Sequence, residues 1–160
     1  MKIRVEVKIN CILQTVLDYI SNGEKLHEWN SAVKQVEINS RKDDNTTIFS
    51  IVRKLPSQIV ENLLEVTVNK SVNTINMKTT SGYIPFIYHI KLVPFRGTTN
   101  VILNADLNKN DIITLLGPQL KKVPKIILKK MMFKEVNADL YSLKIILEKI
   151  CTEKVDKGVI

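Results

Sequence analysis

Residues 85–107 read PFIYHIKLVPFRGTTNVILNADL, and their pattern predicts two β-strands, Pro85–Pro94 and Thr98–Leu107. In each strand apolar side chains alternate with polar ones, as expected when one face of a sheet is buried and the other faces solvent. The turn residues Arg96 and Gly97 separate the two strands. A connection this short leaves no room for a crossover helix, so the strands must pair antiparallel.

The same alternation predicts five further strands upstream of this pair. They cover residues 2–9, Val33–Asn39, Thr46–Leu55, Ile59–Asn69 and Asn73–Thr80. Position parity along the strands then predicts which side chains face inward. The predicted inner face comprises Val5, Val7, Leu64, Val66, Val68, Ile75, Met77, Thr79, Phe86, Tyr88, Ile90, Leu92, Val101, Leu103 and Ala105.

The inner face of strand 46–55 stays open at this point. Phe49 and Ile51 compete with Ile48 and Val52 for the buried side, since both pairs are apolar. Arg53 shares the parity of Phe49, so it points inward if Phe49 does.

Helical spacing replaces the strand pattern between the first and second strands. Ile12, Val16 and Ile20 recur at helical intervals, and Asn-Gly at 22–23 is a common helix end. A second short helix is predicted over Glu24–Trp29.

A long C-terminal helix is predicted from about residue 111 to 154, with a break or kink where Gly117, Pro118 and Pro124 occur. Its apolar residues gather on two nearly opposite sides. One side holds Leu120, Ile127, Leu128 and Met131, and the other holds Phe133, Val136, Leu140, Leu143, Leu147 and Ile150. Either the two halves bury different faces in one core, or the first half is a movable lid or a surface that meets a membrane or partner.

These elements predict an α+β fold in which a seven-stranded, curved antiparallel sheet wraps around the long C-terminal helix. A lone curled sheet must cover its apolar face, and the final helix is the only predicted element long enough to do so. We expect one domain over residues 1–160, because no linker, repeat or low-complexity tract interrupts the pattern.

The composition excludes several kinds of chemistry. Two histidines and two cysteines cannot supply a four-ligand zinc site at any recognised spacing, and the common nucleotide-binding motifs are absent. We therefore expect no metal and no cofactor. Cys11 and Cys151 are expected to be reduced, buried thiols. No apolar run approaches the roughly 18 residues that span a bilayer, and a cytoplasmic protein is expected.

The net charge of +8 is concentrated in one segment. Between Ile112 and Lys134 there are six lysines and no acidic residue. Four of them fall within about 100° on a helical wheel and predict a basic stripe suited to peripheral contact with an anionic membrane. The four are Lys121, Lys122, Lys125 and Lys129. A nucleic-acid partner is not expected, because the sheet aromatics are predicted to face inward rather than to lie among exposed basic residues.

Several short phrases, taken in order, resemble a known family. They are Asp18-Tyr19-Ile20, Glu28-Trp29-Asn30, Val52-Arg53-Lys54-Leu55-Pro56, Thr80-Ser81-Gly82 with Pro85-Phe86 and Tyr88, Thr98-Thr99-Asn100-Val101, and Asp139-Leu140 with Leu143-Lys144 and Leu147-Glu148. Together they resemble the START-related (SRPBCC) superfamily, in its polyketide cyclase/dehydrase or coenzyme-Q-binding-like branch. The resemblance spans nearly the whole chain and implies the helix-grip fold. It also implies a cavity for a lipid, sterol, polyketide, quinone or hormone, but no catalytic residue set.

The leading hypothesis is a protein that binds or carries a hydrophobic small molecule between the sheet and the last helix. The predicted cavity residues are Phe49, Ile51, Leu64, Val66, Met77, Phe86, Tyr88, Ile90, Leu120, Ile127 and Met131. One alternative is a polyketide cyclase or dehydratase in which Tyr88 or Arg53 orients a carbonyl group. Another is a module that docks on a membrane or partner through the lysine-rich helix. The sequence leaves the ligand, the oligomeric state and any catalysis open.

Overall fold

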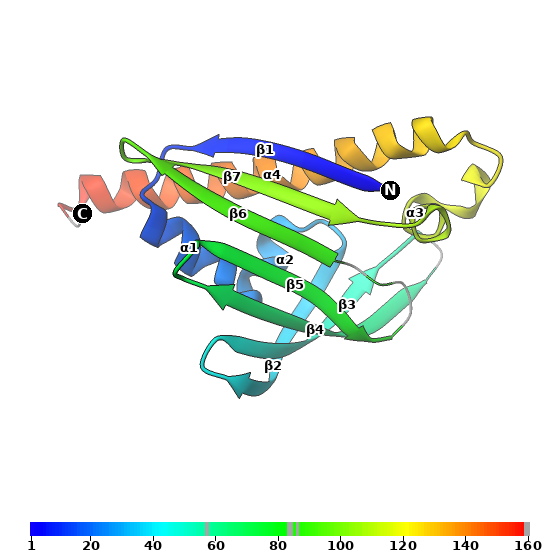
Figure 1. Ribbon diagram of the computed structural model, residues 1–160, viewed down its shortest axis with the longest axis horizontal. Helices are drawn as coiled ribbons and strands as arrows, with labels where there is room; N and C mark the ends of the chain where they lie inside the picture. The colour runs from blue at the N-terminus through cyan, green and yellow to red at the C-terminus, as the bar shows by residue number, and fades with distance from the viewer. Residues whose placement is uncertain (57, 83–84, 86, 159–160) are drawn as a thin grey trace.

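The computed structural model describes residues 1–56, 58–82, 85 and 87–158. Strands and one long C-terminal helix dominate the fold (Figure 1). In chain order the elements are β1 (Lys2–Ile9), α1 (Leu13–Ser21), η1 (Gly23–Lys25), α2 (Leu26–Trp29), β2 (Val33–Asp43), β3 (Thr46–Lys54), β4 (Ile59–Asn69), β5 (Thr74–Ser81), β6 (Ile87–Phe95), β7 (Thr98–Asp106), α3 (Lys109–Leu116), η2 (Pro118–Leu120) and α4 (Lys125–Asp156).

The seven strands form one antiparallel sheet in the order β1-β7-β6-β5-β4-β3-β2. Strands β2 to β7 follow one another as hairpins, and β1 closes the order by pairing with β7. At the opposite edge, β2 pairs with β3 through three register shifts, which bend this edge of the sheet. The curved sheet and α4 (Figure 1) confirm the predicted helix-grip fold, including the short helices α1 and α2 between the first two strands.

The predicted inner face agrees with the observed burial. Phe49 and Ile51 are buried and Arg53 is only 3% exposed, so strand β3 presents the Phe49 side to the interior. Most of the other predicted inward residues are buried as well, and Val7 and Val68 pack against the core while half-buried. Phe86 lies outside the described residues.

Helix α4 buries one continuous stripe rather than two opposite faces. The stripe consists of Leu128, Met132, Val136, Asp139, Leu140, Leu143 and Leu147. The two-sided prediction was wrong, because Leu120 lies in the separate element η2 and Phe133 is 45% exposed. The predicted break is confirmed, since α4 begins only after Pro124. Among the described helices, none is both long enough and apolar enough to cross a membrane.

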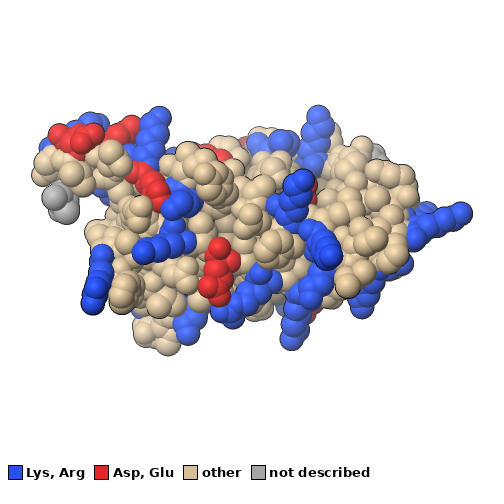
Figure 2. Space-filling model, turned by 90° about the horizontal axis from the view of Figure 1, so that it is seen from above, with Lys and Arg blue, Asp and Glu red and all other residues tan. Residues whose placement is uncertain are grey.

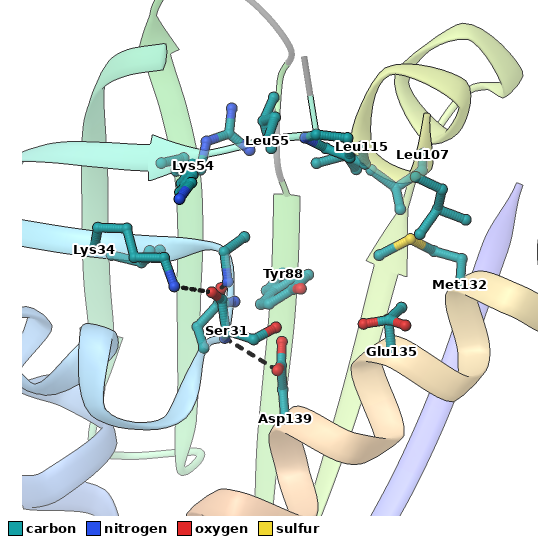
Figure 3. Close-up of a pocket in the computed structure, with 16 residues that line it drawn as sticks. Ser31, Lys34, Lys54, Leu55, Tyr88, Leu107, Leu115, Met132, Glu135 and Asp139 are labelled. Carbon is teal, nitrogen blue, oxygen red and sulfur yellow. Dashed lines mark hydrogen bonds between the residues drawn. The ribbon is translucent and has the colours of Figure 1, made fainter. Parts of the chain in front are cut away.

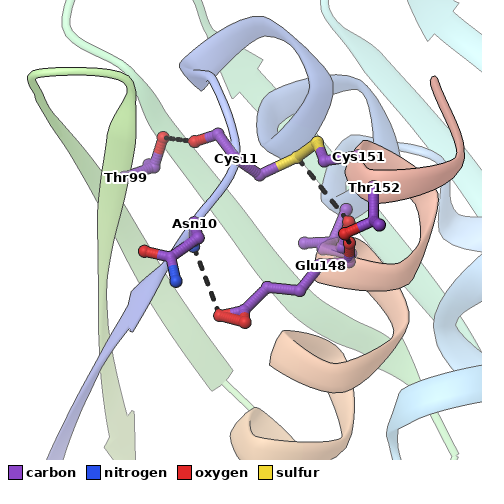
Figure 4. The surroundings of a disulfide bond; sticks show 7 residues. Asn10, Cys11, Thr99, Glu148, Cys151 and Thr152 are labelled. Atoms are coloured by element: carbon purple, nitrogen blue, oxygen red, sulfur yellow. Dashed lines mark hydrogen bonds between the residues drawn. A yellow bond between two sulfur atoms is a disulfide. The ribbon is translucent and has the colours of Figure 1, made fainter. Parts of the chain in front are cut away.

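A disulfide between Cys11 and Cys151 joins the start of α1 to the last turns of α4 (Figure 4). The two Cα atoms are 5.8 Å apart, although the residues are separated by 140 positions in the chain. The prediction of two reduced thiols was therefore wrong, because a sequence does not show that segments so far apart meet. Nearby, the backbone N–H of Asn10 donates to Glu148 Oε1 at 3.3 Å, and Lys144 Nζ donates to the carbonyl of Lys8 at 2.6 Å.

Candidate functional site

A cavity of about 360 Å³ lies between the inner side of the sheet and α4 (Figure 3). This volume falls at the small end of the roughly 300–1,000 Å³ usual for small-molecule sites. The wall is assembled from the turn after α2, the start of β2, the end of β3, β6, the segment from β7 to α3, and α4. Eight of the 16 lining residues are apolar: Ala32, Val33, Leu55, Pro56, Leu107, Leu115, Leu116 and Met132.

Helix α3 brings two of these apolar side chains over the cavity. Its start is fixed by Asn108, whose side-chain oxygen accepts a hydrogen bond of 2.9 Å from the backbone N–H of Asp111, an arrangement typical of N-caps. Its end is fixed by Gly117, which has a φ of +127° that other residues rarely adopt. Leu115 and Leu116 occupy the last turn between these two points and line the cavity.

Tyr88 supplies a buried phenol on the β6 side of the cavity. It sits in register with Met77 on β5 and Ala105 on β7, and its side chain hydrogen-bonds to that of Asn30. Burial raises the pKa of Tyr88 far above its ordinary value, and the nearby Asp139 carboxylate raises it further. The hydroxyl therefore stays protonated and can donate a hydrogen bond.

Arg53 supplies a buried cation at the end of β3. Its Nε donates a hydrogen bond of 2.9 Å to Asn62 Oδ1, and Asn62 Nδ2 in turn donates to the carbonyl of Ser81 at 3.0 Å. Burial lowers the pKa of Arg53, while the attraction of Tyr88 and Asp111 opposes this change. A guanidinium has so high an ordinary pKa that the side chain remains charged.

Asp139 supplies a buried carboxylate from α4, and it points toward Ser31 and Tyr88 (Figure 3). Its Oδ1 accepts a hydrogen bond of 3.1 Å from the backbone N–H of Ser31. Burial raises the pKa of Asp139, hydrogen bonds from Ser31 oppose the rise, and the charge of Glu135 one turn away adds to it. Glu135 also lines the cavity.

The cavity thus combines apolar walls with a cation, a phenol and a carboxylate. Such groups can orient an apolar molecule that carries oxygen atoms at one end, because each satisfies a different hydrogen-bonding need. Within the described part of the chain, no group of three or more His, Cys, Asp or Glu side chains is placed to hold a metal ion.

The structure places the described members of the predicted cavity set in four different environments. Of those that it describes, Tyr88 alone lines the cavity. Six others are packed in the hydrophobic core: Phe49, Ile51, Leu64, Val66, Met77 and Ile90. Leu120 and Met131 pack against the core while half-buried, Ile127 is 46% exposed, and Phe86 lies outside the described residues.

The difference between the predicted set and the lining of this cavity has a simple physical reason. Strand parity separates inward from outward side chains, but it does not show where along a strand the core ends and a cavity begins. The sequence reasoning missed Asp139 as a cavity residue. One signal was present, since Asp139 is an acidic residue at helical spacing within the apolar series Val136, Leu140 and Leu143.

Comparisons with known proteins agree with this fold. A family model described as polyketide cyclase / dehydrase and lipid transport matches residues 1–147. No curated protein matches the sequence significantly. A START superfamily protein from Mycobacterium smegmatis superposes with a TM-score of 0.72 at 17% identity, covering 93% of this chain and 98% of the other.

Two further solved structures show the same architecture. A protein from Thermus thermophilus superposes with a TM-score of 0.71 at 18% identity, covering 90% of this chain and 94% of the other. The ZhuI aromatase/cyclase from Streptomyces sp. R1128 gives a TM-score of 0.67 at 10% identity, with 97% and 95% covered. At these identities the likeness establishes the fold alone.

Proposed function

The chain belongs to the polyketide cyclase/dehydrase and lipid transport family, and from this membership and its cavity we propose that it binds or carries a hydrophobic small molecule of lipid, polyketide or quinone-like type. The observation that carries the proposal is a cavity of about 360 Å³ whose wall combines eight apolar residues with the buried polar side chains of Asn30, Arg53, Tyr88 and Asp139. Ligand sites commonly have this composition, since apolar contacts give affinity and a few polar groups give orientation. One ligand-binding domain over residues 1–160 is part of the proposal.

The polar groups narrow the chemistry of the ligand. Arg53 can only donate hydrogen bonds, an ionised Asp139 can only accept them, and Tyr88 can do both. A ligand that carries a carbonyl oxygen together with a hydroxyl or enol group at one end of an apolar body matches all three. Because Arg53, Tyr88 and Asp139 line the cavity, an oxygen-bearing ligand can form polar contacts there that a purely aliphatic molecule cannot.

Native mass spectrometry of the purified protein, together with an environment-sensitive apolar dye, tests this proposal. Ala32 lines the cavity, so Ala32→Trp should fill part of it and reduce both dye uptake and any co-purified mass. Ala138→Trp is the matched control, because Ala138 is exposed on α4. Dye binding that is absent in the wild type, or equally strong in both variants, would contradict the proposal.

A second candidate function, a polyketide cyclase or dehydratase, is favoured by the raised pKa of Asp139. A carboxylate whose pKa lies closer to neutral is a better general base for removing a proton from a carbon between two carbonyl groups. Arg53 and Tyr88 would then stabilise the carbonyl oxygen that gains negative charge. If this is correct, Asp139→Asn abolishes the cyclisation of a poly-β-ketone, while the poly-β-ketone still binds measurably through Arg53, Tyr88 and the apolar part of the wall. Equal conversion by variant and wild type, or none by the wild type, rejects catalysis.

A cytoplasmic location remains a prediction. A disulfide usually persists outside the reducing cytosol, although intracellular proteins of hyperthermophiles are an exception. Thiol alkylation in intact cells, followed by mass analysis of Cys11 and Cys151, would test the location through the redox state of this pair.

A further inference from the structure

The segment from Lys121 to Lys134 presents an exposed basic surface at the end of the molecule where α4 begins. It carries six lysines, all exposed: Lys121, Lys122, Lys125, Lys129, Lys130 and Lys134. None of the salt bridges formed among the described residues involves them. Figure 2 shows basic side chains over this end of the molecule and a group of acidic ones toward the opposite end.

The sequence predicted that the four lysines of the stripe lie on one helix, but in the structure they do not. Lys121 and Lys122 lie in the turn between η2 and α4, whereas Lys125 and Lys129 lie in the first turns of α4. The helical-wheel stripe is therefore replaced by a broader surface built from the turn and the helix start.

Large apolar side chains are exposed among these lysines. Ile126 is 67% exposed, Ile127 46% and Phe133 45%. Ile126 and Phe133 are seven residues apart and so project in nearly the same direction from α4. They point away from Leu128 and Met132, which are buried in the core. Single exposed apolar residues are ordinary, but three within eight residues, surrounded by lysines, form a mixed surface that needs an explanation.

We propose that this surface, residues 121–134, docks on an anionic lipid bilayer. Each lysine near an anionic membrane surface contributes about 1 kcal/mol to the free energy of binding. Burial of isoleucine and phenylalanine side chains in the interfacial region of the bilayer strengthens binding further. A nucleic acid would use the lysines but leave Ile126 and Phe133 without an apolar partner, so the lipid surface accounts for more of the observed residues.

The position of the surface connects docking to the cavity. Met132 and Glu135 line the cavity from α4, only a few residues from Phe133, which faces solvent. Leu115 and Leu116, just before the basic segment, line it as well. Docking would therefore bring the cavity close to the bilayer, where an apolar ligand could enter or leave. This role in exchange rests on the proposed function, but docking itself does not.

Co-sedimentation with vesicles tests the inference. Wild-type protein is expected to bind vesicles made of equal parts phosphatidylcholine and phosphatidylglycerol, more weakly as salt is added, and to bind phosphatidylcholine vesicles much less. The double variant Lys125→Gln/Lys129→Gln should bind the anionic vesicles roughly ten- to thirtyfold more weakly. Ile126→Ser/Phe133→Ser should also weaken binding, although the net charge is unchanged.

Matched controls come from the other end of the same helix. Lys149→Gln/Lys154→Gln removes the same charge from exposed positions of α4, and Ile145→Ser removes an exposed apolar side chain. Both controls should bind as the wild type does. The inference would be overturned if the protein bound neutral and anionic vesicles equally, or if the test and control variants lost equal affinity. Lysine-dependent binding to duplex DNA, without binding to vesicles, would also overturn it. Dye uptake in solution without vesicles distinguishes failure of the cavity proposal from failure of docking.

Discussion

Asp139 Oδ1 accepts a hydrogen bond of 3.1 Å from the backbone N–H of Ser31, and this contact holds α4 against the turn between α2 and β2. The contact lies on the cavity wall, since both residues line the cavity. It therefore couples the position of the long helix to the shape of the proposed ligand site.

The protonation of Asp139 should affect stability in a defined direction. Burial raises the pKa of Asp139 above its ordinary value of 3.8, so the folded state binds this proton more tightly than the unfolded state does. The stabilisation that comes from binding this proton is thus fully present below pH 3.8 and is lost as the pH rises through the raised pKa. Above the raised pKa, the free energy of unfolding no longer changes with the titration of Asp139. Asp139→Asn should increase the urea midpoint at neutral pH, and the gain should shrink toward pH 3.8. A pH-independent difference between the two proteins would contradict this expectation.

Leu143→Ala should reduce the free energy of unfolding by about 2–5 kcal/mol. Leu143 is fully buried within the stripe that α4 packs against the sheet, so the truncation leaves a cavity. Ile145→Ala serves as the control, because Ile145 is 56% exposed on the same helix and should change the free energy by no more than about 0.5 kcal/mol. Urea denaturation of both variants measures the difference, and similar losses would show that the assigned face is wrong.

Reduction of the Cys11–Cys151 disulfide should destabilise the fold by about 2–4 kcal/mol, because the bond limits the freedom of the unfolded chain. Thermal or urea denaturation with and without reductant measures the loss. The Cys151→Ser variant should have the same lowered stability as the reduced wild type, and adding reductant should not change its midpoint. Identical midpoints for the wild type under both conditions would argue against a stabilising role for the bond.

Tyr88→Phe should weaken the binding of an oxygen-bearing ligand by roughly five- to tenfold, which corresponds to the loss of one hydrogen bond of about 1 kcal/mol. The ring remains in place, so the affinity for a dye without hydrogen-bonding groups should not change. Isothermal titration with both probes separates the two effects. An equal loss for both would mean that the substitution disturbs the cavity wall rather than a hydrogen bond.

Much of the sheet could be predicted because apolar side chains alternate with polar ones along most strands, and this alternation can be seen within each strand alone. Tyr88, Ile90 and Leu92 alternate with exposed neighbours, and the structure buries all three. Strand β3 gave no such signal, since apolar residues occur at both parities. In the structure, the buried face of β3 includes Arg53, which donates a hydrogen bond to Asn62 on β4. The pattern of a single strand does not contain such a contact with the neighbouring strand.

The remaining features depend on contacts between distant parts of the chain. Apart from its lysines, the start of α4 is apolar almost all round, so periodicity alone did not show that Leu128 faces inward while Ile127 does not. The cavity depends on where α3 crosses the end of the sheet, which no local pattern encodes. The pairing of Cys11 with Cys151 likewise follows only from the complete fold.

The bond between Cys11 and Cys151 also decides how the molecule carries a mechanical load. A pulling force applied to the chain outside the two cysteines passes along β1 to Cys11, crosses to Cys151 and leaves through the end of α4. Strands β2 to β7 lie inside a covalent ring and are shielded from extension. The load falls on the ladder between β1 and β7, from the Lys2–Asp106 pair to the Ile9–Thr99 pair. The force needed to extend the oxidised protein is therefore set by how firmly β1 is held, through its ladder with β7 and its contacts with α4.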